Sequence, residues 1–167
     1  MSITNVKNPV METVTVNRNQ VEHRATWMAL IFDEMRKAGV SNAEEIVRKA
    51  IKRTGNIHGA SHYSKCTDPS DCADFLDVFL GTEDSVAAQT FAMSDLNADR
   101  DNLTVVFHYC PLVDAWQKLG FNDKDIALLC DMAMDGDRGI AEKMGLSLEL
   151  TDTIAKGCET CLLHFHK

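Results

Sequence analysis

The sequence predicts an α+β fold in which helices pack on one face of an antiparallel sheet of about four strands. Amphipathic helical patterns fill the first half of the chain, and strand-like runs begin only after about residue 86. These runs form two pairs, each joined by a turn-rich segment, with a helical stretch between the pairs. Such an order is typical of two layers around one core, so residues 1–167 are expected to form a single domain.

The helical layer is expected to span residues 18–85. From Gln20 to Lys37, apolar residues recur at alternating spacings of four and three, as on the buried face of a helix. Ser41-Asn42-Ala43-Glu44 is a capping-box pattern, which predicts the start of a second helix at Ser41. Asp68-Pro69 predicts the start of a third helix, with proline at the first helical position.

Two segments in this half are expected to lack regular structure. Residues 1–17 show no helical period, which predicts an extended or disordered arm. Residues 56–67 are polar and contain a glycine, so His58 and His62 are expected to lie on a loop.

The second half, residues 86–167, is expected to contain two hairpins with helices between them. The predicted strand pairs are Thr90–Ser94 with Asn102–Tyr109, and Leu146–Ala155 with Cys161–His166. Pro111 predicts the start of one intervening helix, and Asn122 predicts the cap of the next.

The same patterns place several reactive side chains. Alternation along the strand that ends near Tyr109 predicts that His108 and Cys110 point the same way. Helical spacing puts Cys130 on the inward face of the helix capped by Asn122. The residues alone favour a buried core thiol for both Cys110 and Cys130.

Composition excludes several classes of partner. A formal charge of −8 without a long basic run argues against nucleic acid, and no apolar stretch approaches the roughly 20 residues of a membrane span. The N-terminus has no secretory pattern, so a cytoplasmic location and six reduced cysteines are expected. A small-molecule substrate is the expected partner, and assembly into a homo-oligomer stays open.

Three segments of the second half carry a resemblance to a known family. FHYCPLVDAWQKLGF, DIALLCDMAMDGDRGIAEKMG and LELTDTIAKGCETCLLHF together resemble the L-2-amino-thiazoline-4-carboxylic acid hydrolase family. The resemblance implies a hydrolase that acts on a carbon–nitrogen bond of a small carboxylated cyclic isothiourea or amidine, with no required cofactor. The functional positions that it implies are Cys110, Cys130 with Asp131 or Asp135, and Cys161.

The chemistry assigns each of these residues an expected role. Cys110 is expected to be the nucleophile, with His108 as its base, because a thiolate is the reactive form of cysteine. Asp131 and Asp135, one helical turn apart, are expected to hold the amidinium, although composition alone favours a solvated helix face. Arg138 is expected to bind the substrate carboxylate, and Cys130 and Cys161 to line the substrate site.

A metal site and a different function remain alternatives. Cys110, Cys130, Cys161 and His108 could together hold zinc or another divalent metal, since three protein ligands plus water suit a hydrolytic zinc. The alternative function is a sensory module that binds a small ligand or a metal through clustered cysteine and histidine side chains, without catalysis.

Overall fold

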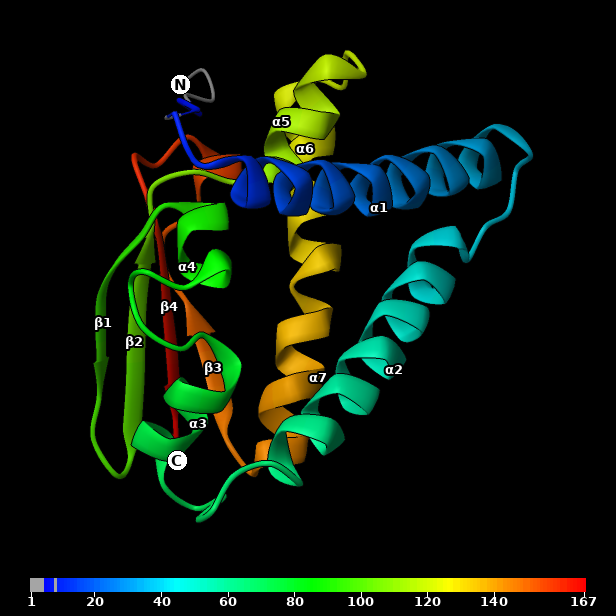
Figure 1. Cartoon of the computed structure of the whole chain (residues 1–167). Helices are drawn as coiled ribbons and strands as arrows, with labels where there is room; N and C mark the ends of the chain where they lie inside the picture. The colour runs from blue at the N-terminus through cyan, green and yellow to red at the C-terminus, as the bar shows by residue number, and fades with distance from the viewer. Residues whose placement is uncertain (1–4, 8) are drawn as a thin grey trace.

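The computed structural model describes residues 5–7 and 9–167 (Figure 1). Its first part is helical and its second part mixes strands with helices, which confirms the predicted α+β class. The elements are α1 (Glu12–Lys37), α2 (Ala43–Tyr63), α3 (Cys72–Phe79), α4 (Val86–Phe91), β1 (Met93–Ala98), β2 (Asn102–Phe107), α5 (Pro111–Lys118), α6 (Asp123–Ala133), α7 (Asp135–Met144), β3 (Ser147–Leu150), the 3-10 helix η1 (Ile154–Lys156) and β4 (Cys161–His166).

The four strands form one antiparallel sheet with the order β1-β2-β4-β3. β2 and β4 are the central pair, with Leu103 opposite Phe165 and Phe107 opposite Cys161. This pairing joins the two predicted hairpins into a single sheet. Along β4, buried residues alternate with partly exposed ones, so one sheet face belongs to the core and the other faces away from it.

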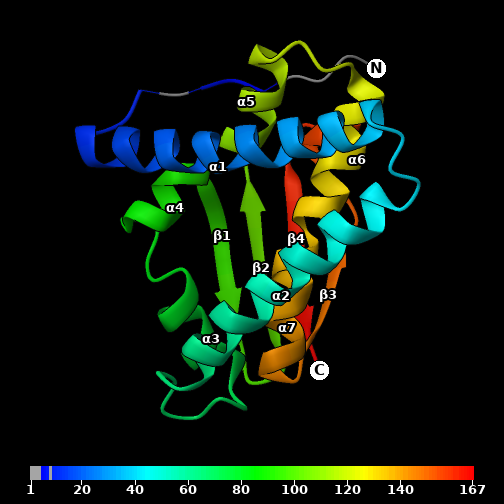
Figure 2. The ribbon, with the colours of Figure 1, turned by 90° about the vertical axis from the view of Figure 1, so that its right-hand side faces the viewer.

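The helices lie on one side of the sheet (Figures 1 and 2). Helix α1 runs across one end of the sheet, and α2 and α7 lie in front of the strands in the view of Figure 2. Trp116 of α5 is fully buried, and its indole Nε1 donates a hydrogen bond of 3.0 Å to the carbonyl of Ala25 in α1. No helix of the described chain covers the opposite sheet face.

Glycines allow α2 and α7 to touch. A Cβ atom at Gly55 would lie 1.9 Å from the carbonyl oxygen of Gly136, and one at Gly59 would lie 2.9 Å from the carbonyl oxygen of Ile140. Only glycine therefore permits this separation between the two helices. The contact runs from Gly55 beside Gly136 to Gly59 beside Ile140 and Lys143.

The predictions of an extended or disordered arm over residues 1–17 and of a loop over residues 56–67 are both wrong in part. Residues 12–17 belong to α1, because Val14 and Arg18 continue its buried stripe; Arg18 donates a hydrogen bond of 2.9 Å to the carbonyl of Thr90. Residues 56–63 continue α2 as helix, because Gly59 packs against α7 instead of ending the helix. Residues 1–4 and 8 of the expected arm lie outside the described residues.

Several boundaries also differ from those expected. Helix α2 begins after Asn42 without a side-chain cap, so Ser41 forms no capping box. Helix α3 begins later than Asp68-Pro69, after Asp71, whose side chain accepts a hydrogen bond from the amide of Ala73. Thr90 belongs to α4, not to the first strand. Pro111 does open α5, and Asn122 does cap α6, as predicted.

Candidate functional site

A cavity of about 480 Å³ lies between the helices and the inner face of the sheet. This volume falls within the range of small-ligand pockets. Most of its wall is apolar, with Phe79, Phe107 and Trp116 among the lining residues. A small polar set interrupts this wall: Arg24, Thr54, His58, His62, Cys110, Cys130, Asp137, Thr153 and Cys161.

The polar set comes from segments far apart in the sequence. Arg24 lies on α1, and His58 and His62 lie on α2. The three cysteines come from the residue before α5, from α6 and from the first position of β4, while Asp137 lies in the first turn of α7. Because so many elements contribute, the cavity exists only in the assembled fold.

Cys110 is held at the N-terminus of α5. Its amide donates to Asn5 Oδ1 at 3.0 Å, and its carbonyl accepts from Asn5 Nδ2 at 3.1 Å, so both backbone groups are fixed by one side chain. Burial raises the pKa of the Cys110 thiol to about 11. The amides of Val113 and Leu112 and the charge of Arg24 act in the opposite direction and favour the thiolate.

Burial also raises the pKa values of the other two cavity thiols. Burial, with a smaller contribution from Cys110, raises the pKa of Cys161 to about 12. The pKa of Cys130 is also raised well above its usual range by burial, with smaller contributions from Cys110 and Cys161. The amide of Ile154 donates to Cys161 Sγ at 3.2 Å. Of the two thiols with a stated pKa, Cys110 is therefore the easier to ionise.

Asp137 is the acidic group of the cavity. Burial raises its pKa to about 6, and the charges of Arg24 and Arg138 offset only part of this effect. No Lys, Arg or His of the described residues lies within ion-pair distance of its carboxylate. A carboxyl group with a pKa near neutrality can both accept and donate a proton at physiological pH.

Arg24 supplies the cation at the cavity. Arg24 is exposed overall, yet its side chain contributes to the cavity lining, so the side chain lies at the opening of the cavity. Within the described part of the chain, no carboxylate lies within ion-pair distance of Arg24. Its guanidinium is therefore free to meet an anionic group that enters from solvent.

Two further polar groups of the lining have unused hydrogen-bonding capacity. His62 Nδ1 and Thr153 Oγ1 are buried and find no partner among the described residues. Burial lowers the pKa of His62, whose ring stands edge-on to Phe79 at 5.4 Å between ring centroids. Since buried polar groups are normally satisfied, these two atoms suggest that the cavity accommodates a polar molecule.

His108 does not share a side with Cys110, so that expectation is wrong. Strand β2 ends at Phe107, and the alternation does not continue past it. His108 is exposed and its Nε2 lies 2.8 Å from the hydroxyl of Ser94, whereas Cys110 lines the cavity. His108 instead borders a separate hollow next to Met11 and Met93.

The structure does not bring Asp131, Asp135 or Arg138 to the cavity lining. Arg138 pairs with Asp131 and with Asp135, both at 2.7 Å. Arg48 of α2 pairs with the same two carboxylates, at 2.7 and 3.1 Å. The two arginines and two aspartates thus form a network that links α2 to the junction of α6 and α7.

The three predicted cysteines do meet in one place, but they do not form a compact set of metal ligands. Among residues 5–7 and 9–167, one group of three potential ligands has all its ligand atoms within 4.8 Å of one another, and it contains no cysteine. That group is Glu149, His164 and His166, on the sheet.

Sequence reasoning missed Arg24 and Asp137 as site residues. Arg24 flanks the apolar stripe formed by Val21, Ala25 and Met28, and Asp137 follows Gly136 directly. The signal that could have found Asp137 is the spacing of small residues, Gly55 with Gly59 and Gly136 with Gly139, which indicates two helices in close contact.

An α+β fold with a cavity of small-ligand size, lined by three thiols and a titratable carboxyl group, is typical of small-molecule enzymes. The family model of L-2-amino-thiazoline-4-carboxylic acid hydrolase matches residues 18–165, and the chain belongs to this family. Membership implies a hydrolase of carbon–nitrogen bonds other than peptide bonds, with a small-molecule substrate. No curated protein matches the chain. Across the described residues, no helix is both long and apolar enough to cross a membrane.

Proposed function

We propose that the central cavity hydrolyses a carbon–nitrogen bond of a small carboxylated cyclic isothiourea or amidine, with Cys110 as the nucleophile. The observation that carries this proposal is the convergence of a thiol, a titratable carboxyl group and a guanidinium on one cavity of about 480 Å³. The family match supports the substrate class, because the family is named for a thiazoline that carries both an amidine-like carbon and a carboxylate.

Charge sets the orientation of the substrate. The substrate carboxylate pairs with Arg24 at the opening, where the guanidinium lacks a carboxylate partner within the described chain. The cationic amidine end then enters the cavity toward Asp137, whose ionised form it favours. His62 Nδ1 and Thr153 Oγ1 are available for hydrogen bonds to the amidine nitrogens.

The Cys110 thiolate forms as Asp137 takes the thiol proton. It adds to the amidine carbon, and the electron pair of the carbon–nitrogen double bond moves onto nitrogen. The amides of Val113 and Leu112, together with Arg24, favour the thiolate before attack. Collapse of the adduct breaks the bond to the ring nitrogen, which leaves with the proton from Asp137.

Water completes the reaction at the same carbon. Asp137 takes one proton from the water as the oxygen adds, and the second passes to Cys110 as the carbonyl forms and the thiol departs. The released amine carries away the proton that remains on Asp137. One water is consumed, one carbon–nitrogen bond is broken and the enzyme is restored.

Arg24→Met tests the binding mode. Hydrolysis of L-2-amino-thiazoline-4-carboxylate is measured over a range of substrate concentrations for the wild type, for Arg24→Met and for Arg53→Met, an exposed arginine outside the cavity. Loss of a charge-assisted pair predicts a fall in kcat/KM of about 10- to 100-fold for Arg24→Met, carried mainly by KM.

Arg53→Met is expected to match the wild type, because it keeps the cavity intact. Equal kcat/KM for Arg24→Met and Arg53→Met would contradict the proposed orientation. Absence of turnover by the wild type would contradict the proposed reaction and favour a module that only binds a ligand.

A further inference from the structure

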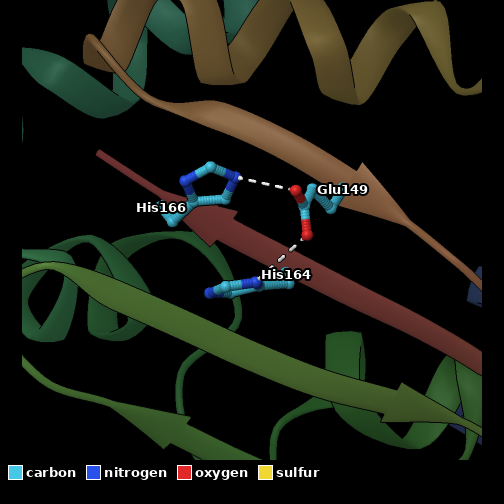
Figure 3. Close-up of side chains that lie close together, drawn as sticks. All are labelled: Glu149, His164 and His166. Atoms are coloured by element: carbon cyan, nitrogen blue, oxygen red, sulfur yellow. Dashed lines mark ion pairs between the residues drawn. The ribbon is translucent and has the colours of Figure 1, made fainter.

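A cluster of three side chains lies on the sheet face that no described helix covers. Glu149 of β3 lies directly opposite His164 of β4, and His166 is the next residue on the same side of β4 (Figure 3). Their nearest ligand atoms all lie within 4.8 Å of one another. The strands fix these positions, because β3 and β4 pair over four residues.

The hydrogen bonds of His164 fix its tautomer. Asn102 Nδ2 donates to Asp99 Oδ1 at 3.2 Å, which orients the amide so that its oxygen faces His164. Asn102 Oδ1 lies 3.0 Å from His164 Nε2 and can only accept, so Nε2 carries the hydrogen. In the neutral ring, His164 Nδ1 then presents a lone pair, 3.8 Å from Glu149 Oε2.

His166 has the same arrangement with its two nitrogens exchanged. Its Nδ1 lies 2.9 Å from the carbonyl oxygen of Lys167, which also can only accept, so Nδ1 carries the hydrogen. His166 Nε2 is left with a lone pair 3.7 Å from Glu149 Oε1, and this buried atom has no hydrogen-bond partner among the described residues.

Two imidazole lone pairs and a carboxylate therefore converge with no donor between them. Three acceptors in this arrangement repel one another unless a cation lies between them. The far nitrogen of each histidine is bonded to an oxygen acceptor, which is the outer-shell pattern of metal-binding histidines. Two histidines and one carboxylate suit Zn²⁺ or a similar divalent transition metal.

We propose that Glu149, His164 and His166 form a divalent transition-metal site that joins the edge strand β3 to β4. Bonds of about 2.1 Å require the ligand atoms to approach by about 1 Å. The Glu149 side chain, 61% exposed, has the freedom to make that movement. The site lies on the opposite sheet face from the cavity, so it does not depend on the proposed hydrolysis.

Calorimetric titration with Zn²⁺ after removal of bound metal by a chelator tests the site. The wild type is expected to bind one ion saturably and to melt at a higher temperature with Zn²⁺ than without it. His166→Ala and Glu149→Gln are each expected to weaken binding at least about 10-fold. His108→Ala, which removes an exposed histidine elsewhere, should bind as the wild type does.

A Co²⁺ titration separates this site from the cavity thiols. Binding to imidazole and carboxylate gives weak visible bands only, whereas thiolate ligands add intense near-ultraviolet charge-transfer bands. Circular dichroism of each variant verifies that it is folded. Three results would each overturn the proposal: unchanged affinity in folded Glu149→Gln and His166→Ala, intense thiolate bands, or no saturable binding by the wild type. If the wild type binds no metal, a proton shared between a histidine and Glu149 is the cation that joins the three side chains.

Discussion

At the scale of single residues, the cavity combines groups whose ionisation is opposed by burial. Cys110 and Asp137 both line it, and burial raises the pKa of each, to about 11 and about 6. Holding a carboxyl group where its charged form is disfavoured destabilises the fold at neutral pH. Such a cost without an ion-pair partner is typical of functional sites, where a group is kept available for a ligand.

Asp137→Asn is therefore expected to stabilise the folded protein at neutral pH. The folded-state pKa of about 6 exceeds the ordinary 3.8, so ionising Asp137 removes stability as pH rises from about 4 through 6. Asparagine has no such ionisation. The variant should thus gain stability relative to the wild type across this window, by at most about 3 kcal/mol at pH 8.

Urea denaturation of the wild type and the variant at pH 4 and pH 8 measures this gain. Asp77→Asn, an exposed aspartate of α3, provides the control and should show the same difference from wild type at both pH values. A difference for Asp137→Asn that does not grow with pH would show that the carboxyl group is solvated in the folded state.

At the scale of elements, the contact between α2 and α7 sets the width of the cavity. His58 and His62 on one helix and Asp137 on the other all line it. The backbones approach closely enough that a methyl group at Gly55 would overlap the carbonyl of Gly136. The ion pairs of Arg48 with Asp131 and Asp135 hold the same helices together nearby.

Gly55→Ala is expected to force these helices apart. Its Cβ would lie 1.9 Å from backbone, which cannot move aside as a side chain could. We expect a loss of about 2 to 3 kcal/mol in the free energy of unfolding, together with reduced turnover, because overpacking displaces the cavity wall.

Gly136→Ala is the matched control for this contact. A Cβ there would meet only Ile51 Cγ2, at 3.5 Å, which is an ordinary contact. Alanine also favours helix over glycine by up to about 1 kcal/mol, so the variant should be as stable as the wild type or more so. Equal losses in both variants, measured by urea denaturation, would contradict the assigned geometry.

At the scale of the whole molecule, the sequence predicted the layers better than the contacts between them. Alternation and turn residues identified four strands and two hairpins, because these signals are local. The pairing of β2 with β4, and the placing of Arg24 and Asp137 on one cavity, depend on contacts between distant segments, which no local pattern encodes. Gly59 was misread because a glycine that ends a helix and a glycine that packs against another helix look alike in sequence.

The cysteines illustrate both what the sequence could predict and what it could not. Cys110, Cys130 and Cys161 were predicted to form one site, and all three line one cavity. All six cysteines are unpaired in the structure, and the reduced state expected from the sequence stays a prediction. The partner expected for Cys110 was wrong, because β2 ends one residue before His108 and the side chain turns to solvent.

Turnover of L-2-amino-thiazoline-4-carboxylate by Cys110→Ser tests most directly whether this cavity is the site of hydrolysis with Cys110 as nucleophile. A hydroxyl group is far harder to ionise than a thiol, so kcat is expected to fall at least about 100-fold while circular dichroism stays unchanged. Cys158→Ser, outside the cavity, should retain wild-type turnover. Near-normal kcat in folded Cys110→Ser would contradict the account and assign the attack to water activated without a covalent intermediate.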